Sequence, residues 1–388
     1  VLAVAEEYTQ QYLRDEVALK ILEPFARPRA SAFVGEMKTM IESLLKSGHA
    51  YAANDGIYFD VLSKTPTPYG TLSGNTLEGL SSGARVEVNE RKKHPADFAL
   101  WKFCVGMNEH HVLRWPSPLA PKGEAFPEGF PGWHIECSAM SSKLLGPQID
   151  LHTGGEDNIF PHHECEIAQS ESVTGKKPFV RIWLHKRHIN LEGEKMSKSL
   201  GNVISLDDIS AKGFHPLDLR YYYCTVQYRT PLRFSWKGME DAHKARRKIM
   251  EWMEEVADWK HGADTEPDDA ILQFSAAFDA AMDSDLNTPG ALGIVFDTMT
   301  WSRNQKQWSF TALTSLRTFI DTVRHVFGCF DKEQTDLALP ADVQVLVDQR
   351  ATARTSKDFA GSDRLRAEIE RLGYEVRDTG EGQVVKKK

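Results

Sequence analysis

The sequence lacks the long apolar segments that a membrane protein or a secreted precursor would need. No run of about 18 apolar residues occurs, and no charged segment followed by an apolar one opens the chain. We therefore expect a cytoplasmic protein with no membrane partner. Cysteine is scarce and scattered, at Cys104, Cys137, Cys165, Cys224 and Cys329. An odd number of thiols in a chain too long to need a disulfide scaffold predicts reduced cysteines.

An excess of positive charge is also absent. The 47 Lys and Arg residues against 55 Asp and Glu residues give a formal net charge of -8. The surface as a whole is therefore not built to bind nucleic acid, and any polynucleotide partner must be bound by local basic patches. The length of 388 residues, with 41% hydrophobic and 26% charged residues, is typical of a globular protein of about two to three domains.

Helical periodicity dominates the start of the chain. Residues 1–17 form one expected helix, and a second helix of about 14 residues follows Pro28, with Ser31 as a candidate N-cap and Gly48 as the C-cap. Residues 51–130 then change to short β-type runs separated by turn residues, which predicts an inserted subdomain of strands and loops. Its expected strands are residues 57–61, 84–88 and 98–103.

Further along, helices and short apolar strands alternate between Gly132 and Ile189, which predicts βαβ units and a parallel sheet. We expect helices at 138–145 and 161–172 and strands at 149–152 and 179–184. Long apolar stripes over 240–260 and 270–330 predict a helical bundle. The tail predicts two short helices, at 343–355 and 361–372, the second closed by Gly373, and a hairpin of residues 375–377 and 383–386.

The strongest local motif is the string KMSKSLGN, residues 195–202. Lys195 and Lys198, together with hydroxyl groups, a glycine and an asparagine on an expected loop, can bind a polyphosphate by charge and hydrogen bonds. An isolated pair of lysines at this spacing is more often a solvated basic turn. The full string is identical to the KMSKS signature of class I aminoacyl-tRNA synthetases with its usual SLGN extension.

A second candidate site consists of Cys137, His162 and Glu166. Pro161 favours the first turn of a helix, so His162 and Glu166, four residues apart, lie on one face, and Cys137 can complete three corners of a tetrahedral metal site. By spacing alone, Cys165 and His163 are equally possible ligands. Without further support the residues are more often a buried thiol and capping or surface histidines.

The third candidate site follows the strand that ends near His152. In a parallel α/β sheet, a Gly-rich turn at the carboxyl end of a strand is where nucleotides bind, and Gly155 and Asp157 lie in such a turn. An aspartate there can accept hydrogen bonds from ribose hydroxyls. An ordinary strand-to-helix turn is an equal alternative on these residues alone.

Together these residues resemble the cysteinyl-tRNA synthetase family, which is a class I aminoacyl-tRNA synthetase family. The matching segments cover most of the chain and are residues 132–140, 149–157, 159–170, 195–202, 228–232, 285–289 and 357–360. The resemblance implies an α/β, Rossmann-like class I synthetase catalytic domain with an inserted subdomain. This domain is followed by an α-helical bundle and a small α+β C-terminal anticodon-binding region.

The resemblance also implies domain boundaries. The expected parts are 1–50 with 131–190 (catalytic Rossmann-like domain), 51–130 (inserted connective subdomain), 191–239 (KMSKS loop and tRNA-stem contacts), 240–335 (helical bundle) and 336–388 (anticodon-binding region). The histidine-containing HIGH signature that binds ATP in this family does not occur in the printed sequence, and no residue matches the family's N-terminal cysteine ligand. We therefore expect that the printed sequence begins inside the catalytic domain.

The implied activity is cysteine–tRNA ligation. L-Cysteine reacts with ATP, accompanied by Mg²⁺, to give cysteinyl-adenylate, and the acyl group passes to tRNA(Cys). Lys198 and Lys195 match the residues that act on the phosphates, and Lys198, Gly155 and Asp157 match the ATP-binding residues. Cys137, His162 and Glu166 match three ligands of one Zn²⁺ ion.

Within the same resemblance, Trp133 matches a residue of the cysteine pocket, with a core aromatic as its alternative role. We expect a monomer. In the tail, Arg354, Asp363 and Asp378 could read base edges, although a solvated, salt-bridged face fits them equally well. Two other functions fit part of the sequence: a mycothiol-type cysteine ligase, against which the tail argues, and a truncated, inactive RNA-binding homologue, suggested by the missing HIGH signature.

Overall fold

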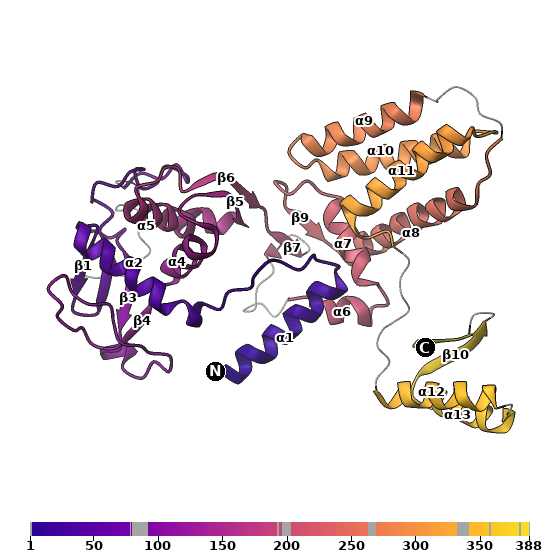
Figure 1. The fold of residues 1–388 in the computed structure, drawn as a ribbon, viewed down its shortest axis with the longest axis horizontal. Helices are drawn as coiled ribbons and strands as arrows, with labels where there is room; N and C mark the ends of the chain where they lie inside the picture. Colours follow the sequence, from indigo (N-terminus) through magenta and orange to yellow (C-terminus); the bar gives the residue numbers. More distant parts are fainter. Residues whose placement is uncertain are drawn as a thin grey trace.

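The computed structural model describes residues 2–77, 79, 92–191, 194–195, 203–262, 269–331, 341–356, 358–379 and 382–387. Figure 1 shows an α/β body at one end of the molecule and a bundle of long helices at the other, with a short connecting region of strands and helices between them. None of the helices in these described ranges combines the length and apolarity needed to cross a bilayer.

The α/β body has one apolar core shared by a sheet and three helices. The sheet is antiparallel, with the strand order β1-β2-β3-β4. Met37, Ile41 and Leu44 of one helix pack in the same core as Trp101 of the sheet and Ile135 of a second helix. The segment between residues 51 and 130 is therefore not a separately packed unit. The elements are α2 (Val34–Ser47), β1 (Ala50–Ala53), β2 (Gly56–Phe59), β3 (Phe98–Phe103), β4 (Gly129–Pro131), α4 (Trp133–Leu145) and α5 (Glu164–Thr174).

The predicted βαβ unit is confirmed. Strand β5 (Ile149–Gly155) pairs in parallel with β6 (Val180–Lys186), in a register that runs from Ile149 opposite Val180 to Gly155 opposite Lys186. Helix α5 is the crossover between them. Because the strands are parallel, their carboxyl ends lie at the same edge, where the segments after Gly155 and after Lys186 meet.

The connecting region has a small sheet in which β7 pairs antiparallel with β8 and parallel with β9. Lys195 ends β8, and its side chain lies outside the described part of the chain, as does all of Lys198. The elements are η3 (Glu156–Asn158) before α5, then β7 (Ile189–Leu191), β8 (Glu194–Lys195), α6 (Leu206–Ala211), α7 (Pro216–Cys224) and β9 (Leu232–Phe234).

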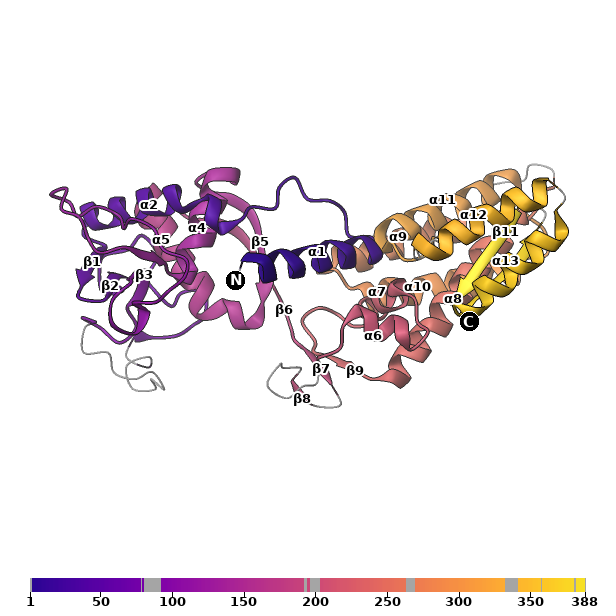
Figure 2. The ribbon, with the colours of Figure 1, turned by 90° about the horizontal axis from the view of Figure 1, so that it is seen from below.

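The bundle confirms the helical predictions for residues 240–260 and 270–330. Its core contains apolar residues of every bundle helix and continues into α7 and β9. Figure 2 shows α1 between the α/β body and the bundle. Arg220 of α7 joins the end of α1 to the bundle, because its guanidinium donates to the carbonyls of Leu19, Lys20 and Phe327 at 2.6–2.7 Å. The helices are α1 (Leu2–Ala18), α8 (Trp236–Asp258), α9 (Asp269–Asp283), α10 (Thr288–Arg303) and α11 (Phe310–Phe327).

The C-terminal part is also as predicted, with two helices and an antiparallel hairpin. Its small core contains Val343 and Val347 of the first helix, Ile369 of the second and Val376 of the hairpin. The elements are α12 (Ala341–Thr355), α13 (Phe359–Arg371), β10 (Tyr374–Thr379) and β11 (Gly382–Lys387).

Three local expectations were wrong or lie outside the described residues. Ser31 does not cap α2, because it lies in a short 3-10 turn, Ala30–Ala32, and the helix begins at Val34 after Phe33. Gly48 does close this helix, with φ at 80°. Helix α4 begins at Trp133, five residues before the predicted start. The prediction missed the first turn because its residues show little apolar periodicity. The strand predicted at 84–88 lies outside the described residues.

A buried ion pair links the connecting region to the bundle. Asp218 of α7 and Arg246 of α8 are both fully buried and lie 2.8 Å apart, and Arg246 Nε also donates to the Cys329 carbonyl at 2.6 Å. His243 Nδ1 lies 2.9 Å from the same carboxylate. Burial opposes ionisation of Asp218, but hydrogen bonds from Arg246 and His243 outweigh it, so the pKa of Asp218 is lowered.

We predict that Arg246→Met lowers the free energy of unfolding by about 3–5 kcal/mol, because it leaves the Asp218 carboxylate buried without its guanidinium. The matched control is Arg303→Met, which removes a partly exposed Arg303–Glu255 pair at 2.9 Å and should cost about 1 kcal/mol or less. Denaturant titration of both variants measures the difference. Equal losses in the two variants would show that the buried pair has no special role.

Candidate functional site

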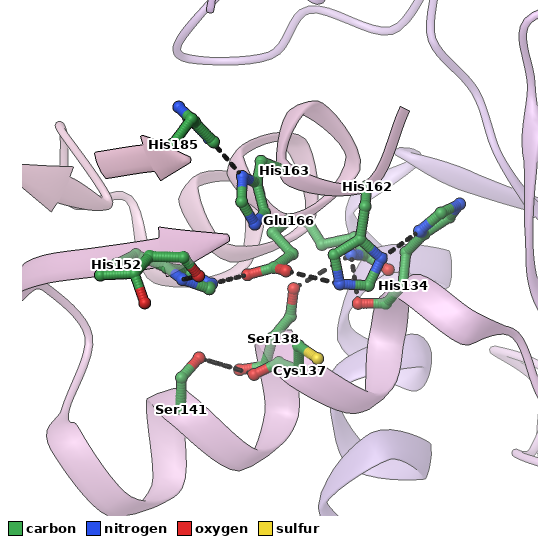
Figure 3. A network of polar contacts seen from close by, with 11 residues as sticks. His134, Cys137, Ser138, Ser141, His152, His162, His163, Glu166 and His185 are labelled. Carbon is green, nitrogen blue, oxygen red and sulfur yellow. Dashed lines mark hydrogen bonds and ion pairs between the residues drawn. The ribbon is translucent and has the colours of Figure 1, made fainter. Parts of the chain in front are cut away.

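The candidate site lies where the carboxyl ends of β5 and β6 meet the first turns of α4 and α5 (Figure 3). Gly132 directly precedes α4 and lies against strand β3 of the antiparallel sheet, where a Cβ atom would lie 2.0 Å from the Ala99 carbonyl oxygen. Only a glycine therefore lets α4 begin this close to β3. Residues 159–163 lead into α5 through a kink at Phe160, which has non-helical dihedral angles (φ -136°, ψ 132°), and carry His162 and His163. The fold therefore brings together side chains that are far apart in the sequence.

The structure brings the predicted ligand candidates Cys137, His162 and Glu166 together. One ligand atom from each of the three lies within 4.8 Å of the others. Glu166 is fully buried, His162 is buried, and Cys137 is half-buried. His162 Nε2 lies 2.9 Å from Glu166 Oε1, yet this oxygen has no aligned hydrogen-bond donor. The three ligand atoms therefore lie close together, and the Glu166 Oε1 atom accepts no hydrogen bond from the other two residues.

The electrostatics of this cluster oppose a free thiolate. Burial raises the pKa of Cys137 to about 12, and the carboxylates of Glu166 and Glu136 add to the effect. Burial also opposes ionisation of Glu166, but the close contacts of its carboxylate with His152 and His162 outweigh it and lower the pKa of Glu166. The pocket therefore holds one carboxylate and one protonated thiol.

Three histidines around this cluster, His134, His152 and His185, were not among the candidate residues predicted from the sequence, whereas His162 and His163 were. His134 Nδ1 lies 2.8 Å from His162 Nδ1, and His152 Nε2 lies 2.8 Å from the Glu166 Oε2 atom. His163 Nδ1 lies 2.8 Å from His185 Nε2 (Figure 3). The available signal was positional: His152 and His185 lie near the carboxyl ends of the two parallel strands.

These histidines are mostly neutral bases at physiological pH. Burial lowers the pKa of His134 to about 4 and that of His163 to about 4, with neighbouring histidines contributing. Burial lowers the pKa of His185 as well. For His152, burial works in the same direction, but its contact with Glu166 outweighs it and raises the pKa. Neutral imidazoles can accept a hydrogen bond from another ring nitrogen or bind a metal ion.

The structure also bears on the two alternative ligands. Cys165 is fully buried, its sulfur lies 3.4 Å from the Tyr69 hydroxyl, and it belongs to neither group of possible ligands among the described residues, so it is a packing residue. His163 belongs to a second group of possible ligands, with His152 and Glu166. Both groups share Glu166. Only the first contains sulfur, the donor that zinc binds at about 2.3 Å in mixed Cys, His and carboxylate sites.

In this arrangement, Cys137, His162 and Glu166 fit a divalent metal such as zinc. They supply three donors of the right types and leave one or more positions for other ligands. The remaining oxygen of Glu166 contacts His152, and the second nitrogen of His162 contacts His134. Such outer contacts orient metal ligands.

Trp133 lies at the edge of the same cluster. Its ring centroid is 4.5 Å from that of His162 and 5.2 Å from that of His134. The residue is 60% exposed, so it is not a core aromatic. Part of the indole therefore lies beside the cluster, and its exposed surface is available to a small ligand.

The candidate nucleotide-binding turn follows directly after β5. Gly155 ends the strand, and Asp157 lies in the 3-10 turn η3 with 60% of its side chain exposed. A Cβ atom at Gly155 would lie 2.5 Å from Asp157 Oδ1, so the glycine leaves room for that carboxylate. The turn and the metal-type cluster lie at the same end of the sheet.

Comparison with known proteins gives family matches along the chain. The family model described as "tRNA synthetases class I (C) catalytic domain" matches residues 1–244, the DALR domain matches 277–331, and the "Cysteinyl-tRNA ligase anticodon binding domain" matches 336–385. A cysteine–tRNA ligase of Thermus thermophilus is 38% identical over 98% of this chain and 78% of its own length. That of Solidesulfovibrio magneticus is 40% identical over 98% of this chain and 81% of its own length.

A solved structure gives the same fold class. Methionyl-tRNA synthetase of Mycobacterium tuberculosis, in complex with methionyl-adenylate, has a TM-score of 0.52 at 14% identity. The match covers 93% of this chain and 83% of that one. At this identity the likeness concerns the fold only.

Gly154 provides a test of how tightly the histidine group is packed. A Cβ atom there would lie 2.6 Å from His163 Cε1, so Gly154→Ala must displace the imidazole. We predict a loss of about 1–3 kcal/mol in the free energy of unfolding. The control Gly35→Ala lies in α2 with nothing within 4 Å and should be neutral or stabilise by up to about 1 kcal/mol. Denaturant titration measures both, and a neutral Gly154→Ala would contradict the prediction.

Proposed function

Since this chain belongs to the cysteinyl-tRNA synthetase family of class I aminoacyl-tRNA synthetases, we propose that it is a cysteine–tRNA ligase. Its substrates are L-cysteine, ATP with Mg²⁺, and tRNA(Cys). The observation that carries the proposal is the convergence of Cys137, His162 and Glu166 beside Trp133, at the end of the strand that leads to Gly155 and Asp157. A sulfur-containing cluster next to a nucleotide-type turn suits the activation of a thiol-bearing amino acid.

The proposed reaction has two steps. The carboxylate oxygen of cysteine attacks the α-phosphorus of ATP, the bond to the β-phosphate oxygen breaks, and pyrophosphate leaves. A terminal ribose hydroxyl of tRNA(Cys) then attacks the carbonyl carbon of the adenylate, and AMP leaves. Neither step needs a protein nucleophile, so the protein contributes chiefly by positioning and by balancing phosphate charge.

Individual residues have distinct proposed roles. Asp157 accepts hydrogen bonds from the ribose hydroxyls, and Gly155 leaves room for that contact. Lys198, assisted by Lys195, neutralises the departing pyrophosphate. Trp133 covers the small side chain of the substrate with its exposed ring.

Cys137, His162 and Glu166 would hold one zinc ion. When bound, the ion would favour a thiolate over a hydroxyl, which accounts for the rejection of serine without an editing site. His134 and His152 orient the ligands from outside by their contacts with His162 and Glu166.

Each part of the chain has a proposed role. We propose 1–50 with 131–190 as the catalytic domain, 51–130 as an insertion packed on it, and 191–239 as the region that contacts the acceptor stem of the tRNA. Residues 240–335 form the helical bundle, and 336–388 bind the anticodon. The proposal includes a monomeric enzyme that works in the cytoplasm, where charged tRNA is used.

The alternatives predict different activities. A mycothiol-type ligase would activate cysteine but transfer it to an amino-sugar, and the anticodon-binding match over 336–385 favours tRNA instead. An inactive RNA-binding homologue would bind tRNA without activating cysteine.

We predict cysteine-dependent exchange of labelled pyrophosphate into ATP and charging of tRNA(Cys), measured on the protein from its full reading frame. Serine in place of cysteine should lower exchange by on the order of a hundred-fold or more, because it cannot supply a thiolate. Exchange without charging would favour the amino-sugar ligase. The absence of both activities would favour the RNA-binding homologue.

We also predict that the purified protein contains about one equivalent of zinc and that Cys137→Ser loses it. Because the pKa of the Cys137 thiol is raised to about 12, the thiol is protonated in the metal-free protein at pH 7, and adding zinc should release its proton. Metal analysis and calorimetry in buffers of different ionisation enthalpy measure these two effects.

The matched control for this experiment is Cys165→Ser, which changes a buried thiol outside the cluster and should keep the zinc. Circular dichroism checks that both variants are folded. Zinc retained in Cys137→Ser, or lost in a folded Cys165→Ser, would contradict the ligand set.

A further inference from the structure

Two adjacent carboxylates in the turn after β5 have different surroundings. The Asp157 side chain is 60% exposed. The Glu156 side chain is only 24% exposed and contacts the segment that follows the neighbouring strand. Arg187 Nη1 pairs with Glu156 Oε2, and the backbone N–H of His188 donates to Glu156 Oε1 at 3.2 Å.

The strand register explains this contact. Gly155 lies opposite Lys186 in the parallel pair of β5 and β6, so Glu156 and Arg187 are the first residues after the ends of these two strands. Both follow the carboxyl ends of the strands, which is the edge where nucleotides bind in this class of sheet. The ion pair therefore joins two loops across the candidate nucleotide site.

The segment around Arg187 is itself held on its other side. Its backbone N–H donates to the Tyr228 carbonyl at 2.9 Å, and β7 begins two residues later, at Ile189, in parallel pairing with β9. His188 Nε2 also lies 3.7 Å from Asp157 Oδ1. The residues at 187 and 188 thus form a fixed platform, and Glu156 connects the turn that carries Asp157 to it.

We propose that Glu156 is a positioning residue: by pairing with Arg187 and the His188 N–H, it holds the turn so that the Asp157 carboxylate meets the ribose of ATP. This inference rests on the proposed function, which assigns ATP to this turn. Glu156 does not contact the nucleotide. It fixes a contact whose geometry would otherwise vary with the conformation of a short turn.

The central variant is Glu156→Gln, which keeps the size of the side chain and removes the charge. In cysteine-dependent pyrophosphate exchange, we expect KM for ATP to rise about tenfold with kcat within about twofold, because the pair acts on nucleotide placement. Zinc content should equal that of the parent. A loss of kcat together with zinc would show that Glu156 only supports the fold.

The specific readout is selection for the ribose hydroxyls. The parent should prefer ATP over 2′,3′-dideoxy-ATP by about tenfold or more, and Asp157→Asn should lose that preference. Glu156→Gln should lose it too, and the double variant should be no worse than Asp157→Asn, because both changes remove the same contact. Additive effects would overturn the proposal.

Charge reversal tests the pairing itself. Glu156→Arg and Arg187→Glu should each raise KM for ATP, and the double variant should recover most of the loss. Failure to recover would mean that Arg187 acts on ATP directly, which overturns the proposal.

The chain offers a matched control on the same two strands. Asp150 and Arg181 form an exposed pair at 3.2 Å near the amino ends of β5 and β6. Asp150→Asn and Arg181→Gln should keep the parental KM and ribose preference, and a change equal to that of Glu156→Gln would indicate a general effect of surface charge.

Failure of the proposed function is distinguishable from failure of this inference. If the parent shows no cysteine-dependent exchange, the ligase proposal fails, and calorimetric binding of ATP and 2′,3′-dideoxy-ATP to the same variants still decides the role of Glu156. A parent that binds both nucleotides equally, or a Glu156→Gln variant that discriminates as the parent does, would overturn the inference.

Discussion

The site depends on one buried carboxylate. Glu166 is fully inside the α/β body, and its two oxygens face different partners: Oε2 contacts His152 and Oε1 faces His162 and Cys137. A lone carboxylate at this depth would cost several kcal/mol and would take up a proton instead. The two imidazoles keep it ionised, which in turn fixes their own ring orientations. Strand β5, the turn before α5 and the first turns of α4 are thereby held in one arrangement.

The connecting region joins the α/β body, which contains this site, to the helical bundle. Asp218 and Arg246 join the connecting region to the bundle, and Arg220 ties in the end of α1 through backbone carbonyls. Helix α7, which carries Asp218 and Arg220, shares one apolar core with β9 and the bundle, and β9 pairs with β7 directly after the platform at residues 187 and 188. Packed elements therefore connect the site to the bundle.

Much of this arrangement was predictable from the sequence because it depends on local patterns. Apolar periodicity located the bundle helices and the two parallel strands, and the four-residue spacing of His162 and Glu166 placed both on one face. The predicted start of α2 was wrong. Ser31 is a good capping residue by type, but the chain there forms a 3-10 turn before the helix begins. Intrinsic preference is weak and tertiary context overrides it.

The histidine group could not be predicted for a different reason. His134, His152, His163 and His185 come from a helix, two strands and a turn, and no spacing in the sequence connects them. The pairing of Glu156 with Arg187 is of the same kind, because it depends on the register between β5 and β6. Register is a tertiary property, and a shift by one residue would send both side chains to the opposite face.

The pocket, as built from protein groups alone, is electrostatically incomplete. Cys137 and Glu166 are both potential anions in one buried space. Burial is the main cause of the raised pKa of the Cys137 thiol, and the carboxylates of Glu166 and Glu136 add to it. Burial keeps His134 and His163 neutral at physiological pH, so these two imidazoles add no positive charge to the pocket. A divalent cation is the group that would satisfy the unpaired Glu166 oxygen and allow the thiol to ionise. In the proposed ligase, a bound cation of this charge would favour a second sulfur ligand over an oxygen ligand, which is the electrostatic basis of the proposed selection for cysteine.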